Sequence, residues 1–373
     1  MRFRIDVPTF RSAVERASHA TTPSALTPIL DNILIDARFK KLILIGNNLE
    51  IAIESTVTEH LDIESEGKFT ISSRFITSYL ALVQEKDMLV ELEKDGTLRF
   101  ETKSGETKFK GTSADKFPLI PQIHSDMKIE MTAWDMKRAI EKTIFSTADG
   151  AIRPMLAGIY LRILDERILF ASTDSYRLSE FSLPRTEIKE SGTSLIIPKN
   201  TATELVRILT DEASPVFLSL EENQLLIQSW SIRLSSRLLS GKFPDYEAFF
   251  PKDHTTKAVF QRSECINVLK QVNLVARNNH SNVCARFDLS GKIEISSWDT
   301  ELWKSSITLP ASVEWAAEMI KFNAQFLLDV LSVMREEHIS LDFRSPLTPI
   351  VIRWVAGEEK KYTYRHLIMP LKI

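Results

Sequence analysis

The stretch STDSYRL, residues 172–178, gathers hydroxyl, carboxyl and guanidinium groups within seven positions. Such groups can supply a nucleophile, or an acid and a base. A short polar segment between two apolar runs is also typical of a tight turn, in which an Asp side chain accepts hydrogen bonds from the following backbone amides. We favour the turn and keep a hydrolase that uses Asp174, Tyr176 and Arg177 as the alternative.

Sequence motifs of common enzymes and metal sites are absent from the chain. There is no G-x-x-x-x-G-K-[ST], no G-x-G-x-x-G, no H-E-x-x-H and no C-x-x-C. Cys265 and Cys284 are too few for a disulfide framework and lack metal-ligand spacing. No two of the seven histidines stand at metal-ligand spacing. The sequence therefore predicts no catalytic residue, no metal site and no cofactor.

Composition is ordinary for a globular, core-forming protein: 43% of the 373 residues are hydrophobic and 26% are charged. The first 17 residues hold no apolar run long enough for a signal peptide, and no run of about 18 apolar residues occurs elsewhere. We therefore expect a cytoplasmic protein without a membrane partner. The net charge of −3 argues against a uniformly basic nucleic-acid binder.

An internal repeat organises the chain. Phe117-Pro118 in ADKFPLIP recurs as Phe243-Pro244 in SGKFPDYEAFFP, and Met369-Pro370 follows at the same interval of 126 residues. Beginnings agree with ends, since FRIDVPTFRSAVERA matches IEMTAWDMKRAIEKT at the interval of 126, and AVFQRSECINVLKQV lies 129 residues further on. We infer three homologous domains, with the boundaries 1–125, 126–253 and 254–373.

Hydrophobic periodicity changes in one order within each copy. Alternating apolar residues at 3, 5 and 7 predict a strand, and apolar residues at 10, 13, 14 and 17 predict a helix that leads into further strands such as NILIDA and LILIGN. The same order starts again at GKFTISSRFITSYLALV. Each domain therefore consists of two β-α-β-β-β units in an α+β fold, with antiparallel sheets that need cover on one face.

Basic residues gather on the predicted helices, whereas strand segments such as EHLDIESE and ELEKDG are rich in acid. Lys and Arg are good helix formers, so a single basic helix needs no further explanation. Equivalent helices in three similar domains carry the same bias, and this favours a common basic face suited to a polyanion. The residues concerned are Arg11, Arg16, Lys137, Arg138, Lys142, Lys199, Arg207, Lys270 and Arg277.

The whole chain resembles the family of bacterial DNA polymerase III β subunits, the sliding clamps. The resemblance runs through the N-terminal helix, LTPILDNILI, GNNLEI, ADKFPLIP, STDSYRL, GKFPDYEAFFP, FNAQFLLDVL and the closing LIMPLKI. It implies the DNA clamp fold: three similar domains that close as a head-to-tail homodimeric ring around duplex DNA, with helices lining the hole. The implied function is DNA polymerase processivity without catalysis.

The resemblance also implies a groove that binds short linear peptides from the polymerase α subunit, the clamp loader, other polymerases and repair proteins. Carried over by motif, the groove residues are Leu156, Thr173, Ser175, Tyr176, Arg177, Leu178, Pro244, Phe249, Asn323, Phe326, Leu347, Leu367, Ile368, Met369, Pro370, Leu371 and Lys372. Ser175, Tyr176, Ala248 and Phe326 depart from the family's common pattern, which bears on the peptide preference rather than on the presence of a groove.

The remaining sites concern DNA and the dimer. The residues expected to face DNA without reading its sequence are Arg11, Arg16, Arg74, Lys137, Arg138, Lys142, Arg153, Lys199, Arg207, Lys270 and Arg277. At the dimer contact the resemblance places Phe109 of one copy opposite Leu274 and Val275 of the other. A monomeric adaptor with three peptide-binding domains and no DNA function is a further alternative.

Overall fold

The computed structural model describes residues 1–118, 120, 123, 128–150, 152–185, 191–297, 304–314, 318–355 and 362–371. No helix in these ranges is long and apolar enough to cross a membrane. The α-helices in the described ranges are α1 (Val7–Ser18), α2 (Ser73–Leu82), α3 (Ala133–Thr143), α4 (Lys199–Ile208), α5 (Arg262–Ala276) and α6 (Ala324–Val333).

The chain forms two compact units. The first comprises residues 1–136 and 204–238, and the second comprises residues 137–203 and 239–373. The division falls inside α3 and α4, so each unit holds a part of the predicted central domain. The predicted boundaries of the three domains therefore stay a prediction.

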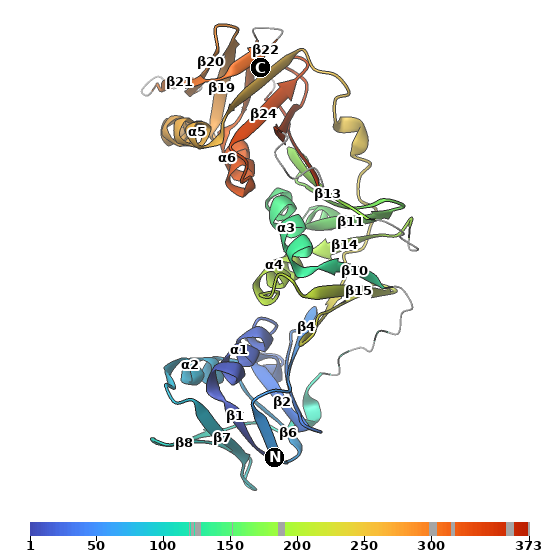
Figure 1. Ribbon diagram of the computed structural model, residues 1–373, viewed down its shortest axis with the longest axis vertical. Coiled ribbons are helices and arrows are strands. Elements are labelled where there is room, and N and C mark those ends of the chain that lie inside the picture. Colours follow the sequence, from blue (N-terminus) through green and yellow to red (C-terminus); the bar gives the residue numbers. More distant parts are fainter. Residues whose placement is uncertain are drawn as a thin grey trace. The chain divides into compact units, whose positions relative to one another are not determined.

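The first unit contains two antiparallel sheets (Figure 1). The five-stranded sheet has the order β5 (Leu61–Ser65), β1 (Arg2–Asp6), β7 (Asp87–Leu92), β8 (Thr97–Thr102) and β9 (Gly105–Lys110). The eight-stranded sheet has the order β10 (Ile129–Thr132), β15 (Pro215–Glu221), β16 (Gln224–Gln228), β17 (Ile232–Arg237), β4 (Ile51–Val57), β3 (Lys41–Asn47), β2 (Asn32–Arg38) and β6 (Gly67–Ser72).

The second unit is built in the same way. Its nine-stranded sheet has the order β14 (Ser194–Pro198), β11 (Gly158–Leu164), β12 (Arg167–Thr173), β13 (Arg177–Pro184), β26 (Thr363–Ile368), β25 (Ile350–Trp354), β24 (His338–Phe343), β18 (Thr256–Gln261) and β22 (Ser312–Glu314). Its four-stranded sheet has the order β21 (Ser306–Pro310), β20 (Lys292–Ser297), β19 (Asn282–Asp288) and β23 (Met319–Asn323).

The order of elements along the chain confirms the predicted β-α-β-β-β units. The first unit of this kind is β1-α1-β2-β3-β4, the second is β6-α2-β7-β8-β9, and four more follow, each with one helix after its first strand. Only β5 and β22 are additional among the described strands. The α+β class predicted from periodicity is correct.

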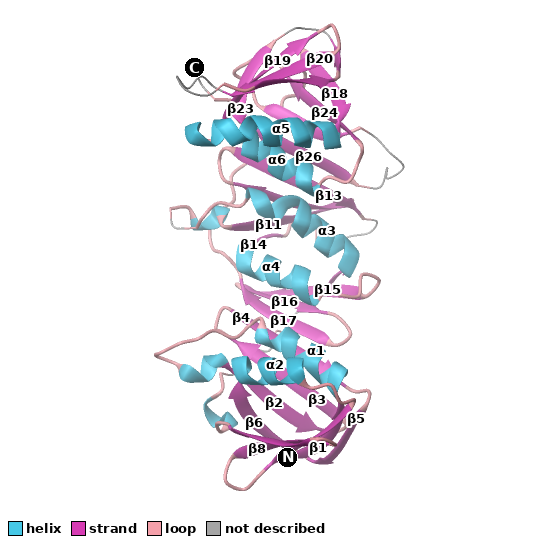
Figure 2. Ribbon diagram, turned by 90° about the vertical axis from the view of Figure 1, so that its left-hand side faces the viewer, coloured by secondary structure: helices cyan, strands magenta, loops and turns pink. Residues whose placement is uncertain are grey.

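Helix α1 shows why the sequence folds this way. Asp6 caps it, because its Oδ2 accepts a hydrogen bond from the amide of Thr9 at 3.0 Å, and Pro8 stands in the first turn, where no amide is needed. Phe10 and Val14 lie on the buried face, as their spacing predicts. Helices α1 and α2 pack side by side against the sheets of the first unit (Figure 2), and their apolar faces form its core with residues of both sheets.

The last strands of the repeated units pair with one another. In the first compact unit β4 pairs antiparallel with β17, and Ala52 faces Ser235. In the second compact unit β13 pairs antiparallel with β26, and Leu178 faces Leu367. The last strands that remain, β9 and β21, each form the edge of a sheet within the described part of the chain. The fold therefore uses one type of strand junction twice and leaves two strands of the same type open.

Candidate functional site

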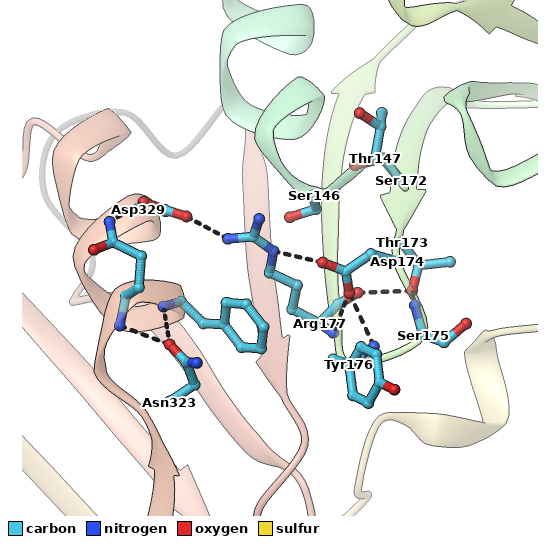
Figure 3. A network of polar contacts seen from close by, with 12 residues as sticks. Ser146, Thr147, Ser172, Thr173, Asp174, Ser175, Tyr176, Arg177, Asn323 and Asp329 are labelled. Carbon is cyan, nitrogen blue, oxygen red and sulfur yellow. Dashed lines mark hydrogen bonds and ion pairs between the residues drawn. The ribbon is translucent and has the colours of Figure 1, made fainter. Parts of the chain in front are cut away.

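The turn between β12 and β13 shapes the candidate site (Figure 3). Asp174 Oδ1 accepts hydrogen bonds from the amides of Tyr176 and Arg177, both at 2.9 Å, and the amide of Ser175 donates to Thr173 Oγ1 at 3.0 Å. Ser175 has φ of 79°, the left-handed conformation that such a turn requires. The structure thus confirms the turn, and the carboxylate of the alternative hydrolase is occupied in holding it.

Arg177 ties this turn to helix α6. Its Nε contacts Asp174 Oδ2 at 2.9 Å, its Nη1 pairs with Asp329 on α6, and its guanidinium lies 4.5 Å from the ring centre of Phe326. Asn323 caps α6 by accepting a hydrogen bond from the amide of Gln325 at 2.8 Å. Arg177 therefore links the turn to α6 through Asp329 and Phe326, and Asn323 lies at the start of that helix (Figure 3).

A cavity of about 240 Å³ opens next to the turn. Its floor is a row of facing strand residues, Thr173, Leu178 and Leu367, and all three are buried. Phe249 and Met369 stand at its rim and are partly exposed. The full lining among the described residues is Arg153, Thr173, Ser175, Arg177, Leu178, Pro244, Tyr246, Phe249, Leu367 and Met369. Such a hollow with an apolar floor and a polar edge fits an apolar side chain.

A second hollow of about 290 Å³ shares Arg153 and Ser175 with the first. The guanidinium of Arg153 donates to Ser175 Oγ at 3.0 Å, so this pair lies between the two hollows. Ile152 and Tyr176 line the second hollow and are highly exposed. Together the hollows form one groove, which we call the β13 groove.

Most of the predicted groove residues meet here. Those that line one of the hollows are Leu156, Thr173, Ser175, Tyr176, Arg177, Leu178, Pro244, Phe249, Leu367 and Met369. Phe326 lies against the guanidinium of Arg177, and Asn323 caps the helix that carries Phe326. Pro370 is half-buried, the amide of Leu371 donates to the carbonyl of Lys321 at 2.8 Å, and Leu347 is exposed on a loop. Lys372 lies outside the described residues.

One predicted groove residue, Ile368, lines neither hollow, and its place in the groove stays a prediction. Ile368 is fully buried, because successive residues of β26 point to opposite faces of the sheet and Leu367 takes the groove face. Tyr246 and Ile152 also line the hollows and were not predicted from the sequence. Arg153 lines both hollows, whereas the sequence predicted that it faces DNA. Tyr246 follows the repeated Phe243-Pro244 pair, and that repeat was the available signal.

Three buried polar side chains near the groove, Ser179, His366 and Glu180, have partners within the fold. Ser179 Oγ lies 2.8 Å from both His366 Nδ1 and Ser146 Oγ, and burial lowers the pKa of His366 well below its ordinary value, so the ring is neutral. Arg365 contacts Glu180 at 2.6 Å and covers the ring of Phe250 at 3.8 Å. Among the described residues no group of three potential metal ligands occurs.

The predicted DNA-facing residues divide into two groups. Lys142 is buried, donates to the carbonyl of Val333 and lies over the rings of Trp354 and Tyr364, so the prediction that it faces DNA is wrong. Arg138 is largely covered and lies 5.1 Å from the ring centre of Tyr362. Arg153 lines the groove and is exposed, and for Arg138 and Arg153 a place facing DNA stays a prediction.

The other basic residues stay nearer to solvent. Arg74, Arg207, Lys270 and Arg277 are exposed, and Lys137 and Lys199 are half-buried. Arg11 donates to the carbonyl of Val83 at 2.7 Å and Arg16 to Ser55 Oγ at 3.0 Å, which fixes both side chains on α1. Of the predicted dimer residues, Leu274 is exposed on α5, Val275 is half-buried beside it, and Phe109 lies half-buried on β9.

Sequence comparison shows the family to which the chain belongs. Models of the N-terminal, central and C-terminal domains of the DNA polymerase III beta subunit match residues 1–121, 130–245 and 247–372. The beta sliding clamp of Staphylococcus aureus is 26% identical, with 100% of this chain and 99% of the relative covered.

Solved structures agree. The sliding clamp of Bacillus subtilis superimposes with a TM-score of 0.93 at 26% identity, over 100% of this chain and 99% of that one. A Pseudomonas aeruginosa clamp bound to griselimycin superimposes with a TM-score of 0.94 at 20% identity over the full length of both chains.

The clamp fold and the match of all three domain models define the class of protein as a non-catalytic processivity factor of DNA polymerase. This chain belongs to the family of DNA polymerase III beta subunits, the sliding clamps. Its function is to act as a DNA polymerase processivity factor.

Proposed function

We propose that two copies of this chain close head to tail into a ring in which β9 of one copy pairs with β21 of the other. The pattern of strand junctions is the observation that carries this proposal. The last strands of four β-α-β-β-β units already pair as β4 with β17 and β13 with β26, and β9 and β21 are the two that remain. Pairing them also removes two open sheet edges, which otherwise favour aggregation.

Side chains around these edges support the pairing. Phe75 on α2 is exposed and lies 6.4 Å from Phe109 on β9, measured between ring centres, and Tyr79 packs against Phe109 at 5.3 Å. On the other side Leu274 is 69% exposed on α5. Apolar groups of this size exposed on both surfaces are typical of an interface between copies.

The β13 groove takes short linear peptides through apolar side chains. Burying a large apolar side chain contributes about 1.5 to 3 kcal/mol, and ordering the peptide backbone offsets part of this. Two such anchors contribute about 3 to 6 kcal/mol, which corresponds to dissociation constants from the millimolar range down to tens of micromolar. Such affinities permit exchange among the polymerase α subunit, the clamp loader, other polymerases and repair proteins.

DNA passes through the ring and meets the exposed basic residues without sequence readout. Arg74, Arg207, Lys270 and Arg277 are exposed on or directly after helices, and they have the charge and reach for phosphate contacts. Phosphate contacts carry no sequence information, which sliding requires.

The proposal is tested by solution mass from light scattering together with a small-angle scattering profile. A mass twice that of the 42.5 kDa chain and a profile with a central hole support it. A monomer at micromolar concentration, or a dimer whose profile has no central hole, overturns the ring.

A further inference from the structure

The turn between β3 and β4 has the same hydrogen bonds as the turn of the β13 groove. The amide of Leu49 donates to Asn47 Oδ1 at 2.8 Å, and the amides of Glu50 and Ile51 donate to Asn48 Oδ1 at 3.0 and 2.8 Å. Leu49 has φ of 73°, close to the 79° of Ser175 in the groove turn. The sequence GNNLEI therefore builds the same backbone frame as STDSYRL.

The neighbouring strand is also placed alike. The amide of Arg237 donates to the carbonyl of Glu50 at 3.0 Å, as the amide of Met369 donates to that of Tyr176 at 2.8 Å. Facing residues form corresponding rows across the sheets. The row of the groove is Thr173, Leu178, Leu367 and Val351, and the corresponding row is Asn47, Ala52, Ser235 and Leu226.

A cavity of about 270 Å³ lies at this second frame, and its lining holds more polar side chains than the first hollow of the β13 groove. Ser235 takes the place of Leu367, Arg237 that of Met369, and Ala52 that of Leu178. Glu50 and Gln224 complete the polar wall. The frame that holds an apolar hollow in the β13 groove thus holds a mixed one with polar side chains on one wall here.

Two groups of this cavity lack partners in the described part of the chain. Ser235 is only 7% exposed, and its Oγ has no hydrogen-bond partner there. A buried hydroxyl without a partner costs about 1 to 3 kcal/mol, so a ligand that bonds to it recovers this free energy. Arg237 is exposed and forms no ion pair with any described residue, and a guanidinium binds a carboxylate with two parallel hydrogen bonds.

We propose that this cavity is a second docking site, which takes an extended peptide that presents an acidic side chain. The inference rests on the proposed function, because it takes the peptide as occupant from the shared backbone frame of the β13 groove. The carboxylate lies between Arg237 and the Ser235 hydroxyl. Glu50 on the turn repels an anion, so it confines the carboxylate to the Arg237 side and lowers its affinity.

The test uses a positional-scanning library of N-acetyl hexapeptides, in which each pool fixes one amino acid at one position. Methyl NMR signals of Ala52 and Ile51 report on the new site, and those of Leu178 and Met369 report on the β13 groove. Pools that fix Asp or Glu are expected to shift the Ala52 and Ile51 signals in a saturable way. Pools that fix Leu or Phe are expected to shift the Leu178 and Met369 signals.

Two variants that each remove one charge from the cavity form a matched pair. Arg237→Gln is expected to weaken binding of the acidic pools at least fivefold, and Glu50→Gln is expected to strengthen it about twofold or more. Both residues are exposed, so neither change threatens the fold.

The outcomes separate the two proposals. If the apolar pools shift Leu178 and Met369 but no acidic pool shifts Ala52, the second site is refuted and the β13 groove stands. Equal affinity of Arg237→Gln and wild type for the acidic pools also refutes it. If no pool shifts either pair of signals, the peptide function of the β13 groove fails, and the inference fails with it.

Discussion

Arg177 illustrates how single residues divide the work of the β13 groove. Its charge is balanced by Asp174 and Asp329 and its flat face by Phe326, so it fixes the shape of the groove. Residues at the rim are less constrained. Met369 is 37% exposed, its side chain is unbranched, and such a side chain adapts to different apolar partners.

Met369→Ala is expected to weaken binding of a peptide with two apolar anchors by about fivefold to thirtyfold, which corresponds to one to two kcal/mol. The melting temperature should change little, because much of the side chain already faces solvent. Isothermal titration with a polymerase-derived peptide measures the effect. Met319 on β23 is the control, since it is 40% exposed and lies outside the groove lining. Equal losses in both variants contradict the assignment.

Lys142 makes the stability depend on pH. Burial lowers the pKa of Lys142 from 10.5 to about 8 in the folded protein. Between these two values the unfolded chain binds more protons than the folded chain, so this group makes the protein more stable as the pH rises from 8 to 10.5. Below pH 8 the amine is charged in both states, and its contribution no longer changes.

The variant Lys142→Met removes this dependence. The free energy of unfolding of wild type minus that of the variant is expected to rise between pH 7.5 and 10.5 by at most about 3 kcal/mol. Urea denaturation of both proteins measures it, and the other titrating groups, such as Tyr246 and Cys265, cancel in the difference. A difference that stays constant or falls with pH contradicts the buried, cationic state of Lys142.

The sequence predicted the residues of the turn well and some helix cations badly, for a physical reason. The role of Asp174 follows from local chemistry, because its hydrogen bonds reach only three residues ahead. The burial of Lys142 depends on Trp354 and Tyr364, more than 200 positions away. Helical periodicity separates apolar from polar faces but does not show whether another element covers a polar face.

At the scale of elements, α2 and β9 form one apolar surface. Phe75, Tyr79 and Phe100 all lie within 6.5 Å of Phe109 or of one another, measured between ring centres. Periodicity predicted both elements. It did not predict that β4 pairs with β17, because antiparallel pairing between distant strands depends on which edges meet in space.

The double variant Leu274→Ala and Val275→Ala is expected to be monomeric at micromolar concentration. It removes the apolar part of α5 that we place against Phe109 of the other copy. Truncating two central residues of an interface of ordinary size removes a large share of its binding free energy. Light scattering measures the mass. Leu289→Ala serves as control, because Leu289 is similarly exposed but lies in the turn after β19. A double variant that keeps the dimer mass refutes the contact.

At the scale of the whole molecule, we propose that two copies of the chain, each with three repeated domains, form a closed ring. A ring holds DNA by enclosing it, so its retention depends on the topology of the DNA rather than on tight contacts. The repeat of 126 residues predicted the fold at this scale, because similar sequences place similar junctions at similar positions. The hydrophobic periodicity of one chain does not predict that the ring closes, because closure depends on pairing with a second copy.

The most direct measurement of this claim is retention on DNA. The protein is loaded onto nicked circular DNA with a clamp loader, the partner proposed above. The complex is isolated by gel filtration in high salt, and half of the sample is cut once with a restriction enzyme. High salt removes phosphate contacts but not a closed ring. We expect the protein to stay on the circular DNA and to leave the linear DNA by sliding off its ends. Equal retention on both forms, or loss from both, would contradict it.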